Sequence, residues 1–391
     1  MVTIRTLTLG IAESHPLPAS ILGQAAHILQ EASAQYAAAG YTVQTLRIST
    51  RSLFQDLADW SAAAILVYAR ELQQMLDDFG LEYCSVGTVQ VSEPHVSLQP
   101  LEQVADILAA TTAISMTVQL ATQRYGLRPE AALPTAEIIQ RLAHETDEGF
   151  GNFRFAMLAC VEPGSPFFPS AYHEGPSSLS IGLQGASLLT EELASGESKR
   201  TEPLGLSMIT ERVRTALERA AGPIVSMAQE FVRGKQIRFG GIDLSPAPMG
   251  EESIVPALES CGYGEFGDAG TLAVVAALTE AFKSTGLPTC GYCGLMLPVL
   301  EDRLLGQRWA EKRLTPHQLL LYSAVCGTGL DTIPLAGKTE PAVMAHLLLD
   351  VATLALRLRK PLSARLFPVP GRQTGELTVF TSPYLTNTQI G

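Results

Sequence analysis

The pattern that decides the fold is set in residues 1–50, which read MVTIRTLTLG IAESHPLPAS ILGQAAHILQ EASAQYAAAG YTVQTLRIST. Apolar and polar residues alternate over residues 4–9, as in a strand, and the Ala-, Leu- and Gln-rich stretch 19–39 is typical of a helix. A second alternating stretch follows over residues 41–48. Strands separated by a helical segment of this length favour an α/β arrangement.

The same alternation continues along the rest of the chain. Further helices are predicted over residues 61–79, around 101–108, and over 134–144, 204–231 (kinked at 222–223) and 341–359. Further strands are predicted over residues 83–89, 113–120, 153–161, 237–244 and 362–368. No internal repeat and no low-complexity linker interrupts the pattern. We therefore expect one large α/β body, with an N-terminal part over residues 1–90 that is continuous with a main body over residues 91–391.

Composition excludes several classes of protein. The chain has 391 residues, of which 46% are hydrophobic and 17% charged, and a formal net charge of −12. Phosphate backbones and anionic lipids have no electrostatic reason to bind such a chain, so we expect no nucleic-acid partner and no membrane partner. Six scattered cysteines do not form a disulfide framework, and residues 1–10 resemble a strand more than a signal peptide. These features predict a cytoplasmic protein with reduced thiols, and its size and apolar character suggest a homo-oligomer.

Several segments share one layout, in which a strand runs into a loop rich in Gly, Pro and polar residues. In α/β folds ligands bind at such strand ends, because the sheet fixes the backbone while the loops supply functional groups. The segments are GNFRFAMLAC (151–160), PFFPSAYHE (166–174), GIDLSPAP (241–248), CGYCGLMLPVLED (290–302) and CGTGLDTIP (326–334).

Together with PLSARLFPVPG (361–371), these segments closely resemble the DUF711 family of conserved proteins, also called UPF0210, and the resemblance covers essentially the full length. It implies a pyruvate formate-lyase-like α/β barrel, the scaffold of the glycyl radical enzymes. It also implies a small ACT-domain protein as regulatory partner, since family members are often encoded next to one. A shared fold does not carry its chemistry, so the resemblance implies a fold more firmly than a reaction.

Radical chemistry would need a glycine in an Arg-Val-x-Gly-Tyr-like segment near the C-terminus. The chain offers Gly371 and Gly375 there, in PGRQTGE, without that context. A glycyl radical enzyme with an atypical radical site is therefore kept only as a second alternative.

Three residues are candidate catalytic groups, each with a structural alternative. His173 follows a rigid Pro-Phe-Phe-Pro loop and could act as acid/base or metal ligand, or be a satisfied structural histidine. Asp243 ends a strand and could abstract a proton or bind a cation, or cap its own loop by accepting N–H bonds. Cys290 forms a C-x-x-C with Cys293, which is a redox pair, half a zinc site, or two buried thiols in a tight turn.

Two arginines and one turn are candidate ligand-binding groups. Arg154 and Arg365 lie in strand-like runs and could hold an anion with both guanidinium nitrogens, or form ion pairs with an interior carboxylate such as Asp243 or Asp331. The Gly-bearing turn at 326–332 exposes backbone N–H groups suited to a carboxylate or phosphate. Its predicted binding residues are Gly327, Thr328, Gly329 and Asp331.

No nucleotide cofactor is expected, because no GxGxxG follows the first strand. The ending Gly337-Lys338-Thr339 is similar to that of a Walker A motif, but Thr332 occupies the position where that motif requires Gly. The phosphate-binding loop of a nucleotide enzyme is therefore not predicted.

These features predict a cytoplasmic enzyme that acts on a small, carboxylate-bearing molecule by polar acid/base or metal-assisted chemistry, with lyase and hydrolase not distinguished. A divalent metal (Mg²⁺, Ca²⁺ or Zn²⁺) held by Asp243, Glu301 and Asp302 is a further expectation, since hard oxygen ligands outnumber soft ones. The first alternative is a non-catalytic metabolite-binding or regulatory protein that works with an ACT-domain partner.

Overall fold

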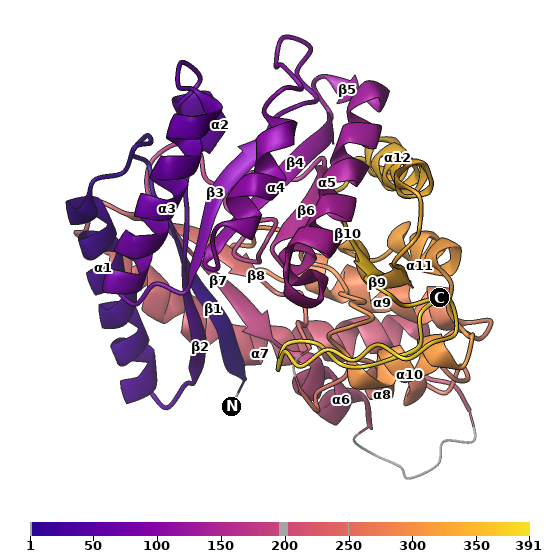
Figure 1. Ribbon diagram of the computed structural model, residues 1–391. Coiled ribbons are helices and arrows are strands. Elements are labelled where there is room, and N and C mark those ends of the chain that lie inside the picture. Colours follow the sequence, from indigo (N-terminus) through magenta and orange to yellow (C-terminus); the bar gives the residue numbers. More distant parts are fainter. Residues whose placement is uncertain (1, 195–201, 249) are drawn as a thin grey trace.

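The computed structural model describes residues 2–194, 202–248 and 250–391, and within them the chain forms one 10-stranded sheet (Figure 1). The strands are β1 (Thr3–Gly10), β2 (Val43–Ser49), β3 (Tyr83–Val89), β4 (Ile114–Thr122), β5 (Gly126–Leu127), β6 (Phe155–Ala159), β7 (Ser178–Gln184), β8 (Arg238–Asp243), β9 (Gly329–Ala336) and β10 (Leu362–Val369). The α/β class is therefore confirmed, and residues 1–90 and 91–391 contribute strands to the same sheet.

The helices alternate with these strands over much of the chain. They are α1 (Ala19–Ala38), α2 (Leu53–Asp56), α3 (Ala62–Asp78), α4 (Leu101–Ala109), α5 (Ala132–Glu145), α6 (Ala186–Ala194), α7 (Leu206–Val232), α8 (Val255–Glu259), α9 (Thr271–Lys283), α10 (Arg303–Ala310), α11 (Pro316–Ser323) and α12 (Pro341–Leu358), with 3-10 turns η1 (Pro129–Ala131) and η2 (Asp147–Phe153). Polar side chains fix several of their beginnings. Ser61 accepts a hydrogen bond from the Ala64 N–H at the start of α3, and Thr315 accepts one from the Gln318 N–H at the start of α11.

The sheet has the order β8-β7-β1-β2-β3-β4-β6-β10-β9, with β5 paired to β4. Strands β1, β2, β3, β4 and β6 are parallel, as helical crossovers between them require. The direction reverses on both sides, since β7 is antiparallel to β1 and β10 is antiparallel to β6. Strands β8 and β9 then continue parallel to β7 and β10.

The two edge strands, β8 and β9, do not pair with each other, so a closed pyruvate formate-lyase-like barrel is not confirmed. Residues 288–299 cross between them instead. The Ile242 N–H of β8 donates to Pro288 O (2.9 Å), and the Val299 N–H donates to Asp331 O of β9 (3.1 Å). This crossing segment contains prolines and glycines that cannot continue a strand ladder, which is why it touches each edge only briefly.

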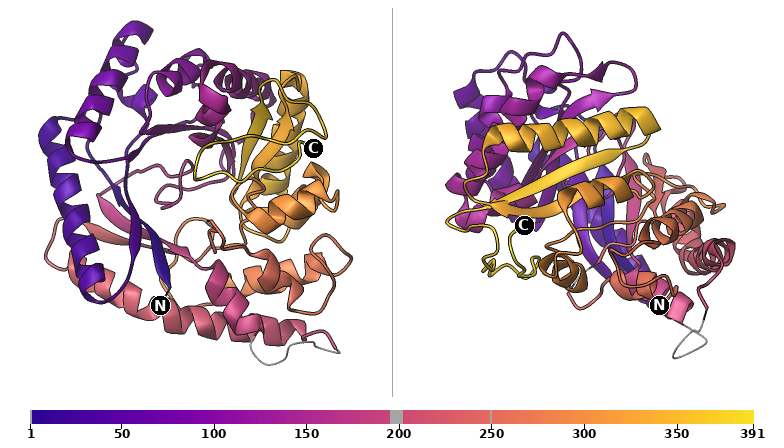
Figure 2. Two further views of the ribbon diagram at one scale, coloured as in Figure 1. Left: turned by 60° about the horizontal axis from the view of Figure 1, so that its bottom comes forward. Right: turned by 90° about the vertical axis from the view of Figure 1, so that its right-hand side faces the viewer.

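The sheet curves around a central space, and the helices lie outside it (Figure 2). Alternation along β1 separates the two faces: Leu7 and Leu9 belong to the large apolar cluster of the molecule, whereas Thr8 faces inward. The long loop over residues 160–177 fills much of the inside. Thr8 Oγ1 donates to Pro166 O (2.9 Å) and Ser85 Oγ donates to Ala171 O (2.5 Å), so inward-facing side chains of β1 and β3 hold the loop in place.

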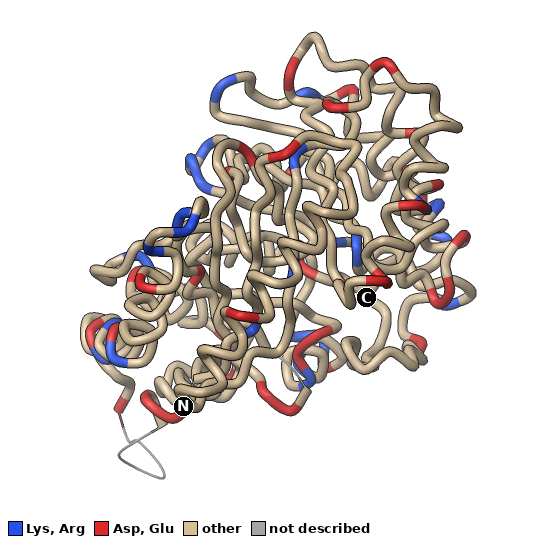
Figure 3. The backbone as a smooth tube through the Cα atoms, turned by 90° about the vertical axis from the view of Figure 1, so that its left-hand side faces the viewer, with Lys and Arg blue, Asp and Glu red and all other residues tan. Residues whose placement is uncertain are grey.

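Helix α12 is, within the described residues, the one helix long and apolar enough to span a membrane by length and composition. Its inner face, which includes Met344, Leu348, Val351 and Ala355, is buried against β10, β6 and α5. The helix is 33% buried, so one face of α12 packs on the sheet and the rest faces outward. On the face shown in Figure 3, acidic and basic residues are interspersed over the outer helices and loops.

Candidate functional site

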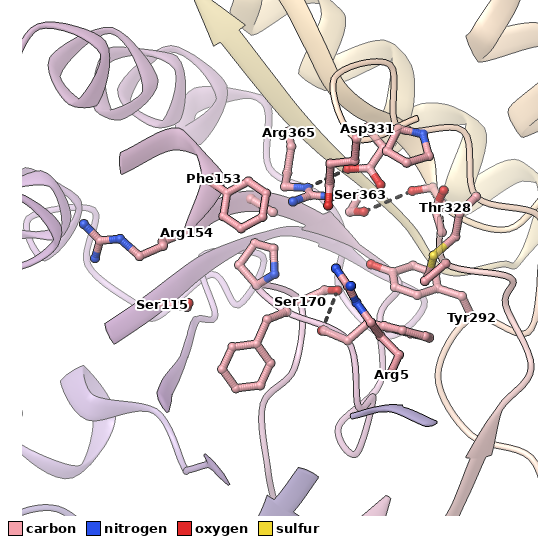
Figure 4. A pocket seen from close by; sticks show the side chains of 18 of the residues that line it. Arg5, Ser115, Phe153, Arg154, Ser170, Tyr292, Thr328, Asp331, Ser363 and Arg365 are labelled. Carbon is pink, nitrogen blue, oxygen red and sulfur yellow. Dashed lines mark hydrogen bonds and ion pairs between the residues drawn. The ribbon is translucent and has the colours of Figure 1, made fainter. Parts of the chain in front are cut away.

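A small cavity lies inside the curve of the sheet, and we call it the interior cavity (Figure 4). Its volume is about 80 Å³. Four arginines line it: Arg5 of β1, Arg47 of β2, Arg154 just before β6 and Arg365 of β10. A cavity needs roughly 10–15 Å³ to hold one water molecule, so this one has room for a ligand of about five to eight non-hydrogen atoms.

One wall of the interior cavity is a buried ion cluster. Arg365 Nη2 lies 2.5 Å from Glu301 Oε1, and Arg365 Nε lies 2.5 Å from Asp331 Oδ1. The guanidinium also lies over the ring of Phe153, 5.4 Å from its centroid. Burial raises the pKa of Glu301, while the nearby Arg365 opposes that shift. Arg365 therefore joins the crossing segment to β9 and fixes the two carboxylates at the cavity wall.

Arg47, unlike Arg365, forms no ion pair with a carboxylate of the described chain. Its side chain is 7% exposed, and no Asp or Glu of the described chain lies within ion-pair distance. Its Nε donates to Thr45 Oγ1 (3.0 Å), and its guanidinium lies over the rings of Tyr83 and Phe168 at 5.0 and 5.2 Å. Burial, and then the like charge of Arg5, lower the pKa of Arg47 to about 9, while the charge of Glu301, beyond ion-pair distance, opposes the shift. Two cations thus approach one cavity, which favours an anion between them.

Neutral hydroxyl groups complete the wall. Tyr292 Oη and Thr328 Oγ1 are buried and make no hydrogen bond within 3.5 Å to the part of the chain that the structure describes. Both residues line the interior cavity, beside Ser170 and Ser363 (Figure 4). Burial raises the pKa of Tyr292 to about 12, so its hydroxyl stays protonated at neutral pH. Hydrogen bonding to the Ser170 and Ser363 hydroxyls opposes the rise in the pKa of Tyr292, so those two side chains lie beside its hydroxyl. Buried hydroxyl groups are normally satisfied, so the open one of Thr328 indicates a hydrogen bond kept for a ligand.

The predicted turn at residues 326–332 reaches the cavity through two of its side chains, Thr328 and Asp331. Gly327 packs directly on Gly294, where an added Cβ would lie 2.2 Å from the Gly327 Cα. The Gly327 N–H donates to Leu295 O (3.2 Å), and Gly329 has a φ of +97° at the start of β9. The glycines therefore let two backbones approach closely, and the side chains rather than the N–H of Gly327 face the ligand space.

Asp243 is fully buried and fastens the crossing segment to β8. Its Oδ1 accepts hydrogen bonds from the Ser245 N–H (3.0 Å), the Ser245 hydroxyl (2.6 Å) and the Cys293 N–H (3.0 Å), and its Oδ2 accepts one from the Tyr292 N–H (2.8 Å). A Cβ at Gly291 would lie 2.2 Å from Oδ2, so only glycine fits there. Burial raises the pKa of Asp243, and these bonds oppose the shift. The carboxylate caps its loop and positions Tyr292.

The two thiols of the C-x-x-C lie in the same tight turn. Cys290 is half-buried and Cys293 is buried, and both are free. Cys293 Sγ donates to Cys290 O (3.4 Å). Burial, together with the charge of Asp243, raises the pKa of both thiols, so neither is held as a reactive thiolate.

His173 lies against β1 outside the interior cavity, in a shallow pocket that also includes Glu174 and Arg238. Its ring packs on Gly10, where an added Cβ would lie 2.1 Å from Nδ1. Its Nε2 lies 3.2 Å from Pro176 O, and burial lowers its pKa. The structure therefore does not bring His173 together with Asp243 or Arg365 at one site.

Arg154 borders the interior cavity, but its guanidinium points away from the other labelled side chains (Figure 4). Its Nη1 donates to Ile114 O (2.8 Å) and its Nη2 to Leu108 O (2.6 Å). Burial lowers the pKa of Arg154 to about 10. These bonds tie the start of β6 to α4 and β4, whereas Arg365 faces the cavity.

The three carboxylates expected to hold a metal are each engaged elsewhere. Asp302 is buried and caps α10, accepting from the Leu305 N–H (3.0 Å) and the Ile254 N–H (2.9 Å). Asp243 caps its loop and Glu301 pairs with Arg365. Within the described residues, no three His, Cys, Asp or Glu side chains are grouped as metal ligands. The residues therefore do not fit the expected metal.

Arg5, Arg47 and Tyr292 were not among the residues singled out from the sequence. A signal for the two arginines exists, since each is a charged residue inside a predicted strand, in Ile4-Arg5-Thr6 and Leu46-Arg47-Ile48. Charged residues are rarely buried, so a charged residue within a strand is a candidate for a binding site. Tyr292 gives no comparable signal, because its position depends on the path of the crossing segment.

Comparison with known proteins shows the family. The family model described as "Uncharacterised ACR (DUF711)" matches residues 1–381. The chain belongs to the DUF711 family. UPF0210 proteins are similar to it over most of their length: one from Clostridium perfringens is 24% identical over 352 residues, covering 87% of this chain and 77% of the relative. Another from Methanopyrus kandleri is 27% identical, covering 80% and 70%, and one from Pyrobaculum arsenaticum is 30% identical, covering 71% and 61%.

Proposed function

We propose that this DUF711 protein is an enzyme that binds a short carboxylate in the interior cavity and acts on it by polar acid/base chemistry. Arg47 carries the proposal, because a buried guanidinium beside Arg5 and without a carboxylate partner is unfavourable unless an anion arrives. The cavity volume of about 80 Å³ restricts that anion to a small acid.

The proposed roles follow from charge. Arg5 and Arg47 hold the carboxylate of the ligand, and Tyr292 and Thr328 donate hydrogen bonds to a second oxygen on it. Glu301 is the acid/base group, since its carboxylate lines the cavity beside the bound ligand and burial raises its pKa while Arg365 opposes the shift. No step is assigned to His173, Cys290 or a metal ion, and lyase and hydrolase chemistry both fit this arrangement.

The test is calorimetric titration with a panel of acids of two to four carbons, including acetate, glycolate, lactate, malonate and alanine. We expect saturable binding of at least one acid, and at least tenfold weaker binding by Arg47→Met, because charge-assisted hydrogen bonds are lost. Arg124→Met, which removes an exposed cation, is the matched control and keeps the affinity. Absence of binding to every acid, or equal loss in both variants, would overturn the proposal.

A regulatory, non-catalytic protein is the second candidate, and one observation favours it. None of the three expected catalytic residues, His173, Asp243 and Cys290, is among the residues that line the interior cavity. On this alternative the same acids bind, but nuclear magnetic resonance of the incubated mixture shows no product with or without an ACT-domain partner. Product formation would decide for the enzyme.

We make three further proposals about the protein as a whole. The first is that the open sheet with its crossing segment is a variant of the pyruvate formate-lyase-like barrel. The contacts of that segment with both edge strands support it. The second is that the protein is cytoplasmic, which its six free cysteines support. The third is that it forms a homo-oligomer. Radical chemistry is not proposed, because Gly371 and Gly375 are exposed and a glycyl radical needs shelter from solvent.

A further inference from the structure

A second, larger pocket lies at the carboxyl ends of β2 and β3, and we call it the rim pocket. It is formed by residues 52–65 and 89–103 and has a volume of about 630 Å³, within the usual range for small-molecule sites. The carboxyl ends of parallel strands are where α/β sheets bind ligands. No residue of the rim pocket lines the interior cavity, so the inference does not depend on the proposed function.

The floor of the rim pocket is apolar and one side is aromatic. Phe54, Leu57, Ile65 and Val89 are buried beneath it. Trp60 stands at its edge and is 42% exposed, an unusual position for so large an apolar ring. A flat ligand could stack on this indole and cover the apolar floor.

The polar groups of the rim pocket are mainly carboxamides. Gln55 and Gln99 are exposed at the pocket, and Gln103 Oε1 is buried without a hydrogen-bond partner in the described chain. The acidic and basic side chains at the pocket, Glu93 and His95, lie 3.2 Å apart and face each other. None of the described lining residues is Lys or Arg, so the pocket lacks the permanently charged side chains that usually pair with a phosphate.

We propose that the rim pocket binds an uncharged nucleobase or nucleoside. A carboxamide presents a donor and an acceptor side by side, which matches the paired donor and acceptor on the edge of a base, as Gln does with adenine. Stacking on an exposed aromatic ring is the other general means by which proteins hold a base. The absence of Lys and Arg from the described lining, together with the carboxylate of Glu93, favours the nucleoside over the nucleotide.

The experiment titrates adenosine, uridine, cytidine, adenosine monophosphate and benzyl alcohol into the full-length protein and records tryptophan fluorescence. The chain has two tryptophans, Trp60 and Trp309. Trp309 is buried and its Nε1–H donates to Gln389 O, so the variant Trp60→Phe identifies the fluorescence signal that comes from the rim pocket. We expect a saturable change with adenosine that is absent in Trp60→Phe, and weaker responses to the monophosphate and to benzyl alcohol. Calorimetry of the same mixtures gives the affinity without fluorescence.

Gln103→Leu keeps the shape of the side chain but removes the unpartnered oxygen, and we expect it to weaken adenosine binding about five- to tenfold. Gln74→Leu, on the outer side of α3 and not at the rim pocket, is the matched control and binds as the wild type does. No saturable response to adenosine, uridine or cytidine by either method would overturn the inference. So would equal binding of benzyl alcohol, or unchanged affinity in Gln103→Leu.

Discussion

The interior cavity and the rim pocket lie near opposite ends of the same strand, β3, which begins at Tyr83 in the cavity wall and ends at Val89 in the pocket. The cavity holds about 80 Å³ among four arginines, two carboxylates and the hydroxyl groups of Tyr292 and Thr328. The pocket holds about 630 Å³ among apolar and carboxamide side chains. Buried cations therefore make the empty interior cavity unfavourable until an anion binds, whereas the rim pocket buries no cation and is stable with only solvent in it.

The largest effect that would sharpen this comparison is expected at the buried ion cluster. Arg365→Met leaves Asp331 and Glu301 buried without their cation, and we expect a loss of about 3–5 kcal/mol in the free energy of unfolding, measured by urea titration. Arg141→Met breaks comparable pairs with Asp106 and Glu145 at the surface and should cost about 1 kcal/mol or less. Equal losses in the two variants would contradict the role given to the interior cluster.

The next effect concerns the close backbone packing beside the interior cavity rather than its charged side chains. Gly294→Ala places a methyl group 2.2 Å from the Gly327 Cα, so we expect a loss of about 1–3 kcal/mol and weaker ligand binding in the interior cavity. Gly286→Ala is the control, because nothing lies within 4 Å of its added methyl group. Adenosine binding at the rim should be the same in both, and a change there would show that the two sites are coupled.

The third prediction concerns pH. Because burial lowers the pKa of Arg47 to about 9, the guanidinium is protonated below that pH and loses its charge above it. Affinity for the acid ligand should be constant near pH 7–8 and fall toward tenfold per pH unit above about 9. Tyr292, with a pKa of about 12, keeps its proton in this window. Calorimetry across pH 7–10.5 tests this, and a flat profile in the wild type would break the argument.

A smaller effect of opposite sign is expected for stability at the same residue. Arg47→Met removes a buried cation that has Arg5 as its neighbour, so we expect the free energy of unfolding to rise by about 1 kcal/mol while acid binding is lost. Differential scanning calorimetry at pH 7 measures this. A variant that is less stable than the wild type would show that stacking on Tyr83 and Phe168 outweighs the burial of charge.

The smallest effect belongs to the rim pocket. Gln103→Leu removes a carboxamide oxygen that has no partner, so the free energy of unfolding should stay within about 0.5 kcal/mol of the wild type. Urea titration beside Gln74→Leu checks it. A loss above 1 kcal/mol would show that the oxygen has a structural role and that the comparison of the two sites is too simple.

The α/β class and many of the elements could be read from the sequence, because their side-chain periodicity is local. The strand predicted over 83–89 is β3, and the helix predicted over 341–359 is α12, one residue longer than observed. The helix predicted over 204–231 is α7, a single helix with Pro223 inside it. The sequence predicts a turn where β9 begins, because β9 starts with Gly329 and contains Pro334, and its pairing with β10 is visible only in three dimensions.

Fewer residues of the candidate site than of the fold could be predicted, and the direction in which each strand runs explains the difference. The rule that ligands bind at the carboxyl ends of strands points to Asp243. This residue lies near the interior cavity because β8 runs antiparallel to the central strands and ends beside that cavity. The same rule overlooked Arg5, which lies near the beginning of β1. Arg365, Thr328, Asp331 and Arg154 are expected from the sequence and line the cavity, but the guanidinium of Arg154, like the ring of His173, makes contacts that hold the fold.

The C-terminal region also determines when the interior cavity can exist. The hydroxyl of Tyr384 contacts that of Tyr83 at 2.8 Å across 301 positions of sequence, and its ring stacks on Phe153. During synthesis the N-terminal arginines leave the ribosome long before Asp331, Arg365 and Tyr384 are made. Arg5 and Arg47 therefore remain in water until translation of the cavity-forming residues is nearly finished, and a chain released early has outer helices but no binding site.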